Sequence, residues 1–577
     1  MLWSVENPQH SRQETEALET LASRVDWLIP GEWRIDSSLR LIWDADILVG
    51  ERRFPVSLRY PTHFPHSPPL VLPRDVSERW SLHQYGPGGE LCLEYGPDNW
   101  HPDITGADMI ESAYRLLAGE HPAPQETGQV ASRHATTLGQ NLRGDRMRFL
   151  ITRELAAIID GISDGEAREG EATGTFRDGS VVYVIGSLSL NDGQVWKDEG
   201  IPKTIFDEGL QRPIAVFRLP AGTKLPSMKS RSDFIADAAA AGVALPKADY
   251  ALVATGESLH AYLLWESDDS ACPISIIPAQ PPAVRLDESH VALKPRKVAV
   301  VGCGSLGSKL AAMLARSGVG NFLLVDDDVM LPDNIIRNDL DWREMGCHKA
   351  DGVARRIGLV NPEAKCEVRQ SRLGGQQSSG SFEGLIETLS GYDLIVDASA
   401  DARVFNYLCA AVEIGKKPML WAEVFGGGFG GMIARYRPGL EPKPAAMRAA
   451  IEQWCVDQGK PIERARAGYE GGSATPLIAD DADVTVIAAH AARLAIDTLI
   501  PREPSIFPNS VYMIGLAAGW VFEQPFDTRP IDVGPPPPEE AQPPDPALVV
   551  EETARLLQLL KKFSDASPAA PADPSAA

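Results

Sequence analysis

The chain has 577 residues, of which 44% are hydrophobic and 23% charged, as expected for a globular protein of several domains. It carries 79 Asp and Glu against 55 Lys and Arg, a net charge of −24. This balance disfavours a nucleic-acid or anionic-membrane partner, because neutralising phosphates requires a basic patch. The start has no signal-peptide pattern and no apolar run is long enough to span a bilayer, so we expect a cytoplasmic protein.

The seven cysteines are widely scattered and include no Cys-x-x-Cys pair. This spacing argues against both a disulfide framework and a tetrahedral zinc site. Free thiols remain, and they are candidates for chemistry.

Residues 1–140 predict a compact α+β unit. Helical spacing over 9–28, with Pro30-Gly31 as a stop signal, indicates an opening amphipathic helix. Short alternating apolar patterns at 39–49 and 54–61 indicate strands, and residues 106–119 return to a helical pattern.

Residues 146–290 predict a middle α+β linker domain, with short strands such as 181–185 and 215–219. We find no chemical motif there, and its role is unassigned. A Pro-rich joint at 276–283 marks its end. Residues 534–577 predict a mobile Pro/Ala-rich tail, with one short helix near 546–562 that is better suited to docking than to chemistry.

Residues 291–533 alternate strand, glycine turn, helix and strand, which predicts a Rossmann-like α/β fold with parallel strands. A buried-strand pattern at 297–301 leads into Gly302-Cys-Gly304-Ser-Leu-Gly307 and then a helix. Such a turn lets backbone N–H groups approach a phosphate. Asp326 ends the next strand, about twenty residues on, where a carboxylate can bind a ribose hydroxyl.

The loop by itself also fits a simple tight turn, and with Asp326 it fits a dinucleotide-dependent dehydrogenase. The polar residues that follow successive strands favour a triphosphate site instead. Because parallel strands end at one crevice, Asn334, Arg337, Lys349 and Asp397 are expected to converge there. The two cations would offset phosphoryl charge and Asp397 would hold Mg²⁺, so we predict ATP and Mg²⁺ as cofactors.

This constellation resembles the ThiF/MoeB/ubiquitin-activating superfamily over roughly 295–525. Members of that superfamily adenylate the C-terminal carboxylate of a small β-grasp protein. The resemblance implies a phosphate loop, a ribose ligand, an Asn and Arg pair, a phosphate-binding lysine and a metal ligand at Gly302, Gly304, Gly307, Asp326, Asn334, Arg337, Lys349 and Asp397. Asn338 stands where many members have Gln, and the family's structural zinc cysteines are missing.

Relatives that pass the activated protein onward carry a catalytic cysteine in or near the crossover loop. Residues 469–476, Tyr-Glu-Gly-Gly-Ser-Ala-Thr-Pro, contain none. Cys455 is the only cysteine beyond Cys409 and is therefore the candidate, although a cysteine beside a tryptophan is as easily a packed apolar residue. Alternatively, the domain delivers the adenylate directly to another thiol.

The N-terminal unit supplies such a thiol. The segment 60–69 with its paired prolines, then His83-Gln-Tyr, Cys92-Leu and Trp100-His-Pro, follow in the order seen in the ubiquitin-conjugating fold, which this unit closely resembles. The resemblance implies that Cys92 accepts the acyl group as a thioester and holds it for a lysine amine. A small buried core cysteine is the alternative.

One position departs from that family's His-Pro-Asn, whose Asn is credited with supporting the oxyanion. Here the residues are His83-Gln84-Tyr85. Any of the three, or a backbone N–H, can serve as the donor, because the role requires only a positioned hydrogen-bond donor. We favour His83 as a catalytic residue, with a structural histidine as the alternative.

The two resemblances together look like bacterial fusions found beside cyclic-oligonucleotide (CBASS) anti-phage synthases, which attach the synthase's C-terminus to targets and so prime it. They imply adenylation of a partner's C-terminus, transfer to Cys92 and an amide to lysine. The alternatives are a sulfur-carrier adenylyltransferase of ThiF/MoeB type and a non-catalytic scaffold for a ubiquitin-like partner. By resemblance we also expect a homodimer through the C-terminal domain.

Overall fold

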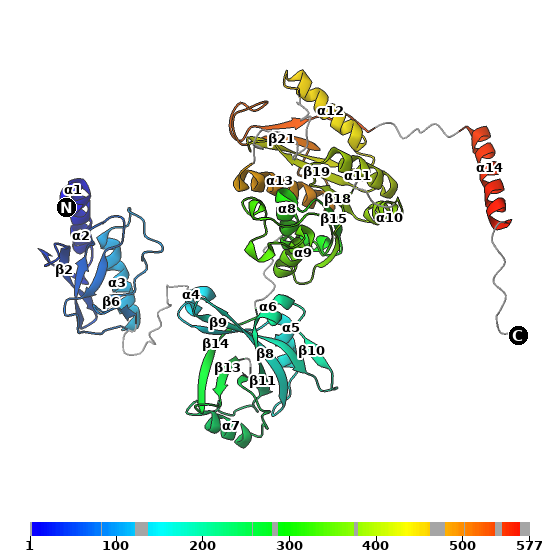
Figure 1. The fold of residues 1–577 in the computed structure, drawn as a ribbon. Helices are drawn as coiled ribbons and strands as arrows, with labels where there is room; N and C mark the ends of the chain where they lie inside the picture. Colours follow the sequence, from blue (N-terminus) through cyan, green and yellow to red (C-terminus); the bar gives the residue numbers. More distant parts are fainter. Residues whose placement is uncertain are drawn as a thin grey trace. The chain divides into compact units, whose positions relative to one another are not determined.

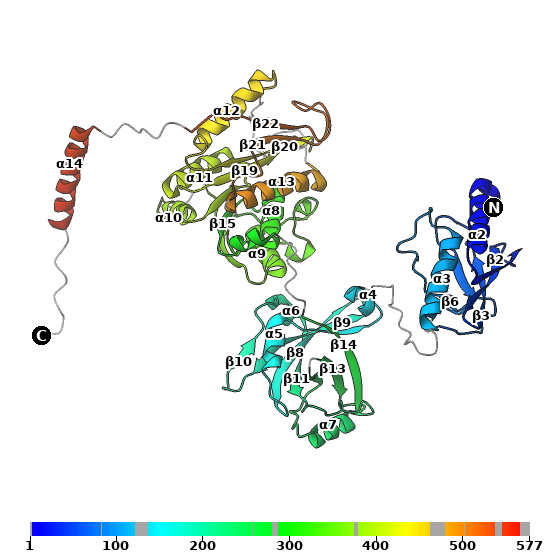
Figure 2. The same cartoon turned by 180° about the vertical axis from the view of Figure 1, so that it is seen from behind.

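The computed structural model describes residues 3–81, 83–121, 137–256, 258–279, 287–373, 379–461, 479–500, 502–536 and 545–565 (Figures 1 and 2). The chain divides into two units, Met1–Gly144 and Asp145–Ala577, each described by itself below. Among the described residues, every helix is too short or too polar to cross a bilayer.

The first unit is an antiparallel four-stranded meander in the order β1-β2-β3-β4 with helices packed against it. A two-stranded ladder, β5-β6, precedes the last long helix. Its elements are α1 (Trp3–Glu6), α2 (Pro8–Arg24), β1 (Leu28–Ile35), β2 (Leu41–Val49), β3 (Arg52–Arg59), β4 (Leu70–Pro73), β5 (Gln84–Tyr85), β6 (Glu90–Leu91), α3 (Gly106–Glu120) and α4 (Leu138–Leu142).

Local sequence accounts for the helix starts of this unit. The Asn7 side chain caps α2, and Thr105 and Asp108 form a reciprocal capping box at α3. The predicted end of the first helix at residue 28 is wrong. Leu28 pairs with Ile47 as the first residue of β1, because its side chain fills the sheet core rather than a helix face.

Residues 147–277 form a sheet that closes on itself, in the order β10-β9-β7-β14-β13-β12-β11-β8 with β8 also paired to β9. The closure leaves a barrel-like sheet with two separate apolar clusters. Its elements are β7 (Met147–Leu150), α5 (Arg153–Asp160), β8 (Ala167–Arg177), β9 (Ser180–Ser189), β10 (Val195–Lys197), α6 (Lys203–Glu208), β11 (Leu210–Arg218), α7 (Arg231–Ala240), β12 (Tyr250–Thr255), β13 (Ser258–Trp265) and β14 (Ser270–Ile277).

Residues 287–531 form an α/β domain around a sheet in the order β17-β16-β15-β18-β19-β20-β21-β22. The strands from β17 to β19 are parallel and the remaining three are antiparallel. The strands are β15 (Lys297–Val301), β16 (Asn321–Val325), β17 (Lys365–Arg369), β18 (Leu394–Asp397), β19 (Met419–Val424), β20 (Gly430–Tyr436), β21 (Val511–Gly515) and β22 (Thr528–Ile531).

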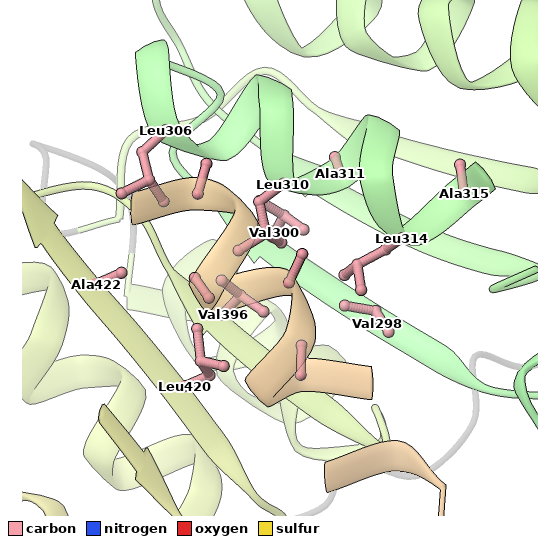
Figure 3. Packing of buried hydrophobic residues seen from close by; sticks show 14 of the residues in the cluster. Val298, Val300, Leu306, Leu310, Ala311, Leu314, Ala315, Val396, Leu420 and Ala422 are labelled. Atoms are coloured by element: carbon pink, nitrogen blue, oxygen red, sulfur yellow. The ribbon is translucent and has the colours of Figure 1, made fainter. Parts of the chain in front are cut away.

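Helices cover both faces of this sheet (Figures 1 and 2). On one face lie α8 (Ser305–Arg316), α9 (Lys349–Val360) and α13 (Asp481–Leu499), and on the other α10 (Ser379–Ser390), α11 (Ala402–Gly415) and α12 (Pro444–Asp457). Short 3-10 turns are η1 (Glu288–Leu293), η2 (Pro332–Asn334) and η3 (Trp342–Glu344). Figure 3 shows Leu310 and Leu314 of α8 beside Val300 and Val298 of β15. This packing fixes the helix that follows the glycine loop.

Beyond the domain, α14 (Pro546–Asp565) lies in the predicted tail. Its apolar residues Leu548, Leu556 and Leu560 are exposed.

A fully buried ion pair joins the antiparallel part of the sheet to α13. The Arg435 guanidinium on β20 donates to Asp497 Oδ2 at 2.7 Å and to the Phe507 carbonyl at 2.9 Å. Both partners of the ion pair have no exposed side-chain surface. Removing one charge would leave the other buried without compensation.

We therefore expect Asp497→Ala to destabilise this sheet by about 3–5 kcal/mol. The matched control is Glu413→Ala, which removes an exposed pair with Lys443 and should cost less than about 1 kcal/mol. Hydrogen exchange of the β20 amides, followed by mass spectrometry, measures the opening free energy of each variant. Equal protection in both variants would contradict a structural role for the buried pair.

Candidate functional site

The glycine loop between β15 and α8 is shaped by two backbone approaches that exclude side chains. Gly302 has φ +91°, and a Cβ there would lie 2.7 Å from the Ala398 carbonyl oxygen. A Cβ at Gly307 would overlap the Gly302 carbonyl oxygen. At Gly304, which precedes α8, a Cβ would meet nothing within 4 Å. The loop therefore leaves open space at the start of a helix, where N–H groups favour an anion.

Two polar side chains hold the Cys303 peptide between these glycines. Asp326, directly after β16, accepts the Cys303 N–H at 2.6 Å and the Asp328 N–H at 2.8 Å. The buried Asn338 amide donates to the Cys303 carbonyl at 3.2 Å. Burial raises the pKa of Asp326, and its two N–H contacts oppose that rise. Asn338 thus supports the loop, a role that sequence reasoning missed by treating it only as a departure from Gln.

Lys349 is the first residue of α9 and is buried. Its ammonium lies 2.5 Å from Asp328 Oδ2, and its backbone N–H donates to the Asp328 carbonyl at 2.9 Å. Asp328 therefore holds a cation beside the loop that Asp326 orients. Sequence reasoning did not assign Asp328 as the partner of Lys349, although the run of three aspartates at 326–328 could have indicated a carboxylate there.

Asn334 and Arg337 lie in and just after η2, in the segment that follows β16. Asn334 Oδ1 accepts the Leu331 N–H at 3.0 Å. Within the described part of the chain, no hydrogen-bond or carboxylate partner is found for the half-buried Arg337 guanidinium. Its role in binding phosphate stays a prediction.

Asp397 ends β18, and the parallel register sets it opposite Val301, the last residue before the loop. Its carboxylate accepts the Ser399 hydroxyl at 2.6 Å and the Ser399 N–H at 3.0 Å. Burial raises its pKa to about 6 despite those two hydrogen bonds.

A second carboxylate shares the face of Asp397. The β18–β19 register pairs Asp397 with Trp421, and Glu423 lies two residues further along β19 on the same side. Burial raises the pKa of Glu423, while the Arg448 guanidinium on α12 lowers it. Sequence reasoning missed Glu423, because its position follows from strand register rather than from a motif.

The structure thus brings the loop, Asp326, Lys349 and Asp397 to the carboxyl ends of adjacent parallel strands. In the ranges that the structure describes, there is no group of three or more His, Cys, Asp or Glu side chains arranged to hold a metal. A cation here would depend on Asp397 and Glu423 together with oxygens of a bound phosphate, as Mg²⁺ commonly does.

Cys455 lies buried in α12 among Met447 and Ile451. Burial raises the pKa of its thiol to about 11, so it is un-ionised at neutral pH. This surrounding is that of a packed core residue and does not favour a thioester role, which stays a prediction. The predicted crossover segment 469–476 lies outside the described residues.

Cys92 lies in the other unit, directly after β6, and is half-buried. Its N–H donates to the His83 carbonyl at 2.8 Å. Burial and then the Asp98 carboxylate raise the pKa of its thiol. Nearby, the Trp100 indole donates to the Pro65 carbonyl at 2.7 Å, which joins two of the segments that the sequence singled out.

The three residues considered as oxyanion donors lie differently around Cys92. Gln84 is engaged in the loop, accepting the Trp80 N–H at 2.6 Å and donating to the Gly89 carbonyl at 2.8 Å. Tyr85 is 49% exposed, and its partial burial, together with Glu90 and Cys92, raises the pKa of its hydroxyl. The His83 ring is half-buried, with its Nε2 3.9 Å from Glu120 Oε1.

Comparison with known proteins identifies part of this chain. The ThiF family model matches residues 283–445, so the chain carries a ThiF family domain over that range. The uncharacterized protein y4qC of Sinorhizobium fredii is 38% identical over 116 residues, 19% of this chain and 20% of that protein. The ATP-dependent ubiquitin transferase-like protein Cap2 of Pseudomonas aeruginosa is 28% identical over 159 residues, 24% of this chain and 26% of Cap2.

The adenylyltransferase and sulfurtransferase UBA4 of Debaryomyces hansenii is 33% identical over 127 residues, 22% of this chain and 27% of UBA4. The chain thus spans only about a fifth to a quarter of the length of these relatives. Among solved structures, E. coli MccB with succinimide is 19% identical with a TM-score of 0.33, covering 43% of this chain and 67% of that chain.

The glycine loop makes a matched pair of variants. Gly307→Ala should lower the stability of the ThiF domain by about 1–3 kcal/mol, because the new methyl overlaps the Gly302 carbonyl. Gly304→Ala should leave stability nearly unchanged, since its methyl meets open space. Thermal unfolding without nucleotide compares the two. A stable Gly307→Ala protein would show that the close approach is not required.

Proposed function

We propose that this protein uses ATP to adenylate the C-terminal carboxylate of a partner protein. The observation that carries this proposal is the convergence of the glycine loop, Asp326, Lys349 and Asp397 at one sheet edge of a ThiF family domain. The names of two relatives, an ATP-dependent transferase-like protein and an adenylyltransferase, support the same reaction.

In this reaction a carboxylate oxygen of the partner bonds to the α-phosphorus of ATP and the bond to pyrophosphate breaks. The loop N–H groups and the start of α8 would face the phosphates, and Asp326 would bind the ribose. Lys349 and Arg337 would offset charge on the departing pyrophosphate, with Asn334 beside them. Lys349 must then exchange its contact with Asp328 for a phosphate oxygen.

The carboxylates at the strand ends fit a magnesium ion. Asp397 and Glu423 offer oxygen ligands on one face, which is the donor chemistry that Mg²⁺ prefers. When bound, Mg²⁺ would neutralise phosphate charge and favour pyrophosphate departure. Asp397 has to be ionised for this role. The same burial that raises its pKa also strengthens its electrostatic attraction for a cation, because the local dielectric is low.

We propose further that Cys92 accepts the acyl group from the adenylate as a thioester and passes it to a lysine amine. Support comes from the order of elements in the first unit, which are a helix, a four-stranded meander, the Cys92 loop and a helix, as in the ubiquitin-conjugating fold. Placing both activities on one chain raises the concentration of Cys92 near the adenylate.

We also propose, because the resemblance to CBASS fusions implies it, a cytoplasmic, homodimeric anti-phage enzyme that attaches a cyclic-oligonucleotide synthase or a ubiquitin-like protein to targets. The name of Cap2, an ATP-dependent ubiquitin transferase-like protein, supports the transfer step. The similarity to UBA4 supports a sulfur-carrier adenylyltransferase as the second candidate. In that case the first unit only docks the carrier. A scaffold without catalysis is disfavoured by Lys349, because burying an ammonium beside the loop costs free energy and an inert scaffold has no need of that charge.

Expression of Cys92→Ser in the native host tests the conjugation. A serine oxygen should retain the acyl group as a slowly hydrolysing ester, so the peptide containing residue 92 should gain the mass of a protein C-terminus. Lys349→Ala combined with Cys92→Ser is the control and should carry no adduct. No adduct on either protein would favour the sulfur-carrier or scaffold function.

Adenylation is tested separately by ATP–pyrophosphate exchange in the presence of the carried protein. Lys349→Ala should reduce exchange by about 10²-fold or more, because it removes a buried cation from the phosphate site. The control is Lys443→Ala, which removes an exposed lysine far along the sequence at α12. Exchange unaffected by Lys349→Ala would refute the site.

The pH dependence tests the role of Asp397. Its pKa is raised to about 6, so below that pH the carboxyl is protonated and cannot bind a cation. At limiting Mg²⁺, exchange should fall about tenfold per pH unit below about pH 6. Excess Mg²⁺ should move the inflection to lower pH, because the metal competes with the proton. An inflection that ignores Mg²⁺ would contradict metal binding at Asp397.

A further inference from the structure

The end of α3 and the β5–β6 ladder bring a carboxylate, an imidazole and a thiol together in the first unit. The ladder pairs Gln84 with Leu91 and Tyr85 with Glu90. One step outward, His83 stands opposite Cys92, and the Cys92 N–H donates to the His83 carbonyl at 2.8 Å. Directly opposed residues of an antiparallel pair project to one face with Cβ atoms about 4.5–5.5 Å apart.

The C-terminal end of α3 packs against the same segment. The His121 N–H caps the helix on the Leu117 carbonyl, and the His121 ring lies 2.9 Å from the Trp80 carbonyl. These contacts hold Glu120 beside His83, at 3.9 Å from Oε1 to Nε2. The distance is within ion-pair range, and a small side-chain rotation or one water would complete a hydrogen bond.

The other carboxylate oxygen, Glu120 Oε2, is buried and has no hydrogen-bond partner among the described residues. A buried carboxylate oxygen without a donor is costly, so its retention calls for an explanation. Only 14% of the Glu120 side chain and 24% of the His83 side chain are exposed. The carboxylate is thus directed at an imidazole rather than at solvent.

We propose that Glu120 is a positioning residue that orients the His83 imidazole, and that His83 is the proton acceptor for the Cys92 thiol. Glu120 has no role in the resemblances stated above. The proposal rests on the proposed acyl transfer to Cys92 and replaces the oxyanion-donor role predicted for His83. With Nε2–H directed at Glu120, Nδ1 is the basic ring atom.

The proton balance is complete. In the first step the thiol proton moves to His83, the sulfur bonds to the acyl carbon, and AMP leaves as the acyl–phosphate bond breaks. The imidazole then releases that proton to solvent. In the second step the amine nitrogen bonds to the acyl carbon and the carbon–sulfur bond breaks. The imidazole takes the proton from the amine and returns it to the thiolate.

Other charged groups act on the same thiol. Asp98 opposes its ionisation, as does burial. Glu90 on β6 is paired with Arg59 on β3 at 3.2 Å, which limits its effect on Cys92. Tyr85 and His121 are further titratable groups near this ladder, and the His121 ring is held by Trp80 and Arg52. The Arg79 guanidinium lies beside Gly89 in the turn between β5 and β6. Thus a nearby proton acceptor is what a neutral thiol in this setting needs.

The test is the rate of Cys92 alkylation by iodoacetamide, measured on the full chain at pH values from about 5.5 to about 9.5 and read from the mass of the Cys92 peptide. His83→Gln and Glu120→Gln should each slow alkylation at neutral pH about tenfold, the effect of about one pKa unit in the thiol. Glu120→Asp should recover part of the rate.

The matched control is Glu111→Gln, which neutralises a carboxylate on the same helix that pairs with Arg24 at the surface. It should keep the parent profile. A Glu120→Gln profile equal to that of Glu111→Gln would overturn the proposal. If circular dichroism shows that Glu120→Gln is unfolded, His83→Gln decides, and a parent-like profile of that variant overturns it.

The alkylation needs neither ATP nor the carried protein. If the Cys92→Ser protein carries no acyl adduct, the conjugating function is refuted, and the proposed proton transfer to His83 can still be measured. If the Cys92 alkylation rate of Glu120→Gln equals that of the parent, the positioning role of Glu120 is refuted and the conjugating function is unaffected.

Discussion

The edge that we propose to bind nucleotide depends on one backbone constraint, the close passage of the glycine loop past the end of β18. Gly302 lies against the Ala398 carbonyl, and Gly307 lies against Gly302. Because no side chain fits at either position, β15 and α8 approach each other tightly, and open space is left at Gly304, where α8 begins. Asp326 and Asn338 then hold the intervening peptide from both of its sides. This arrangement is built before any ligand binds.

The two cations near the loop and the two carboxylates proposed to bind a metal come from different strands. Lys349 and Arg337 come from the segments that follow β16, whereas Asp397 and Glu423 come from β18 and β19 on the other side of β15. A triphosphate lying across the ends of these strands would meet cations on one side and a metal-binding face on the other.

Sequence predicted best what depends on short segments. The glycine loop, Asp326 and the order of strands and helices in the ThiF domain all follow from local spacing. The closure of the middle sheet was missed. It requires β8 to pair with β9 as well as with β11, and the sequence pattern of a single strand does not indicate which strands it pairs with. Asn338, Glu423 and Glu120 were missed for the same reason. Their roles arise from register and from helix ends that meet distant loops.

The two candidate thiols differ in their surroundings, although burial acts on the acidity of both in the same direction. Burial raises the pKa of both Cys455 and Cys92, so neither is ionised by its setting. A carrier thiol must also admit an acyl group and lose its proton to a neighbour. Cys455 is enclosed by apolar side chains, whereas Cys92 is half-buried opposite His83. Access and a proton acceptor, more than thiol pKa, therefore distinguish a site of transfer from a core residue.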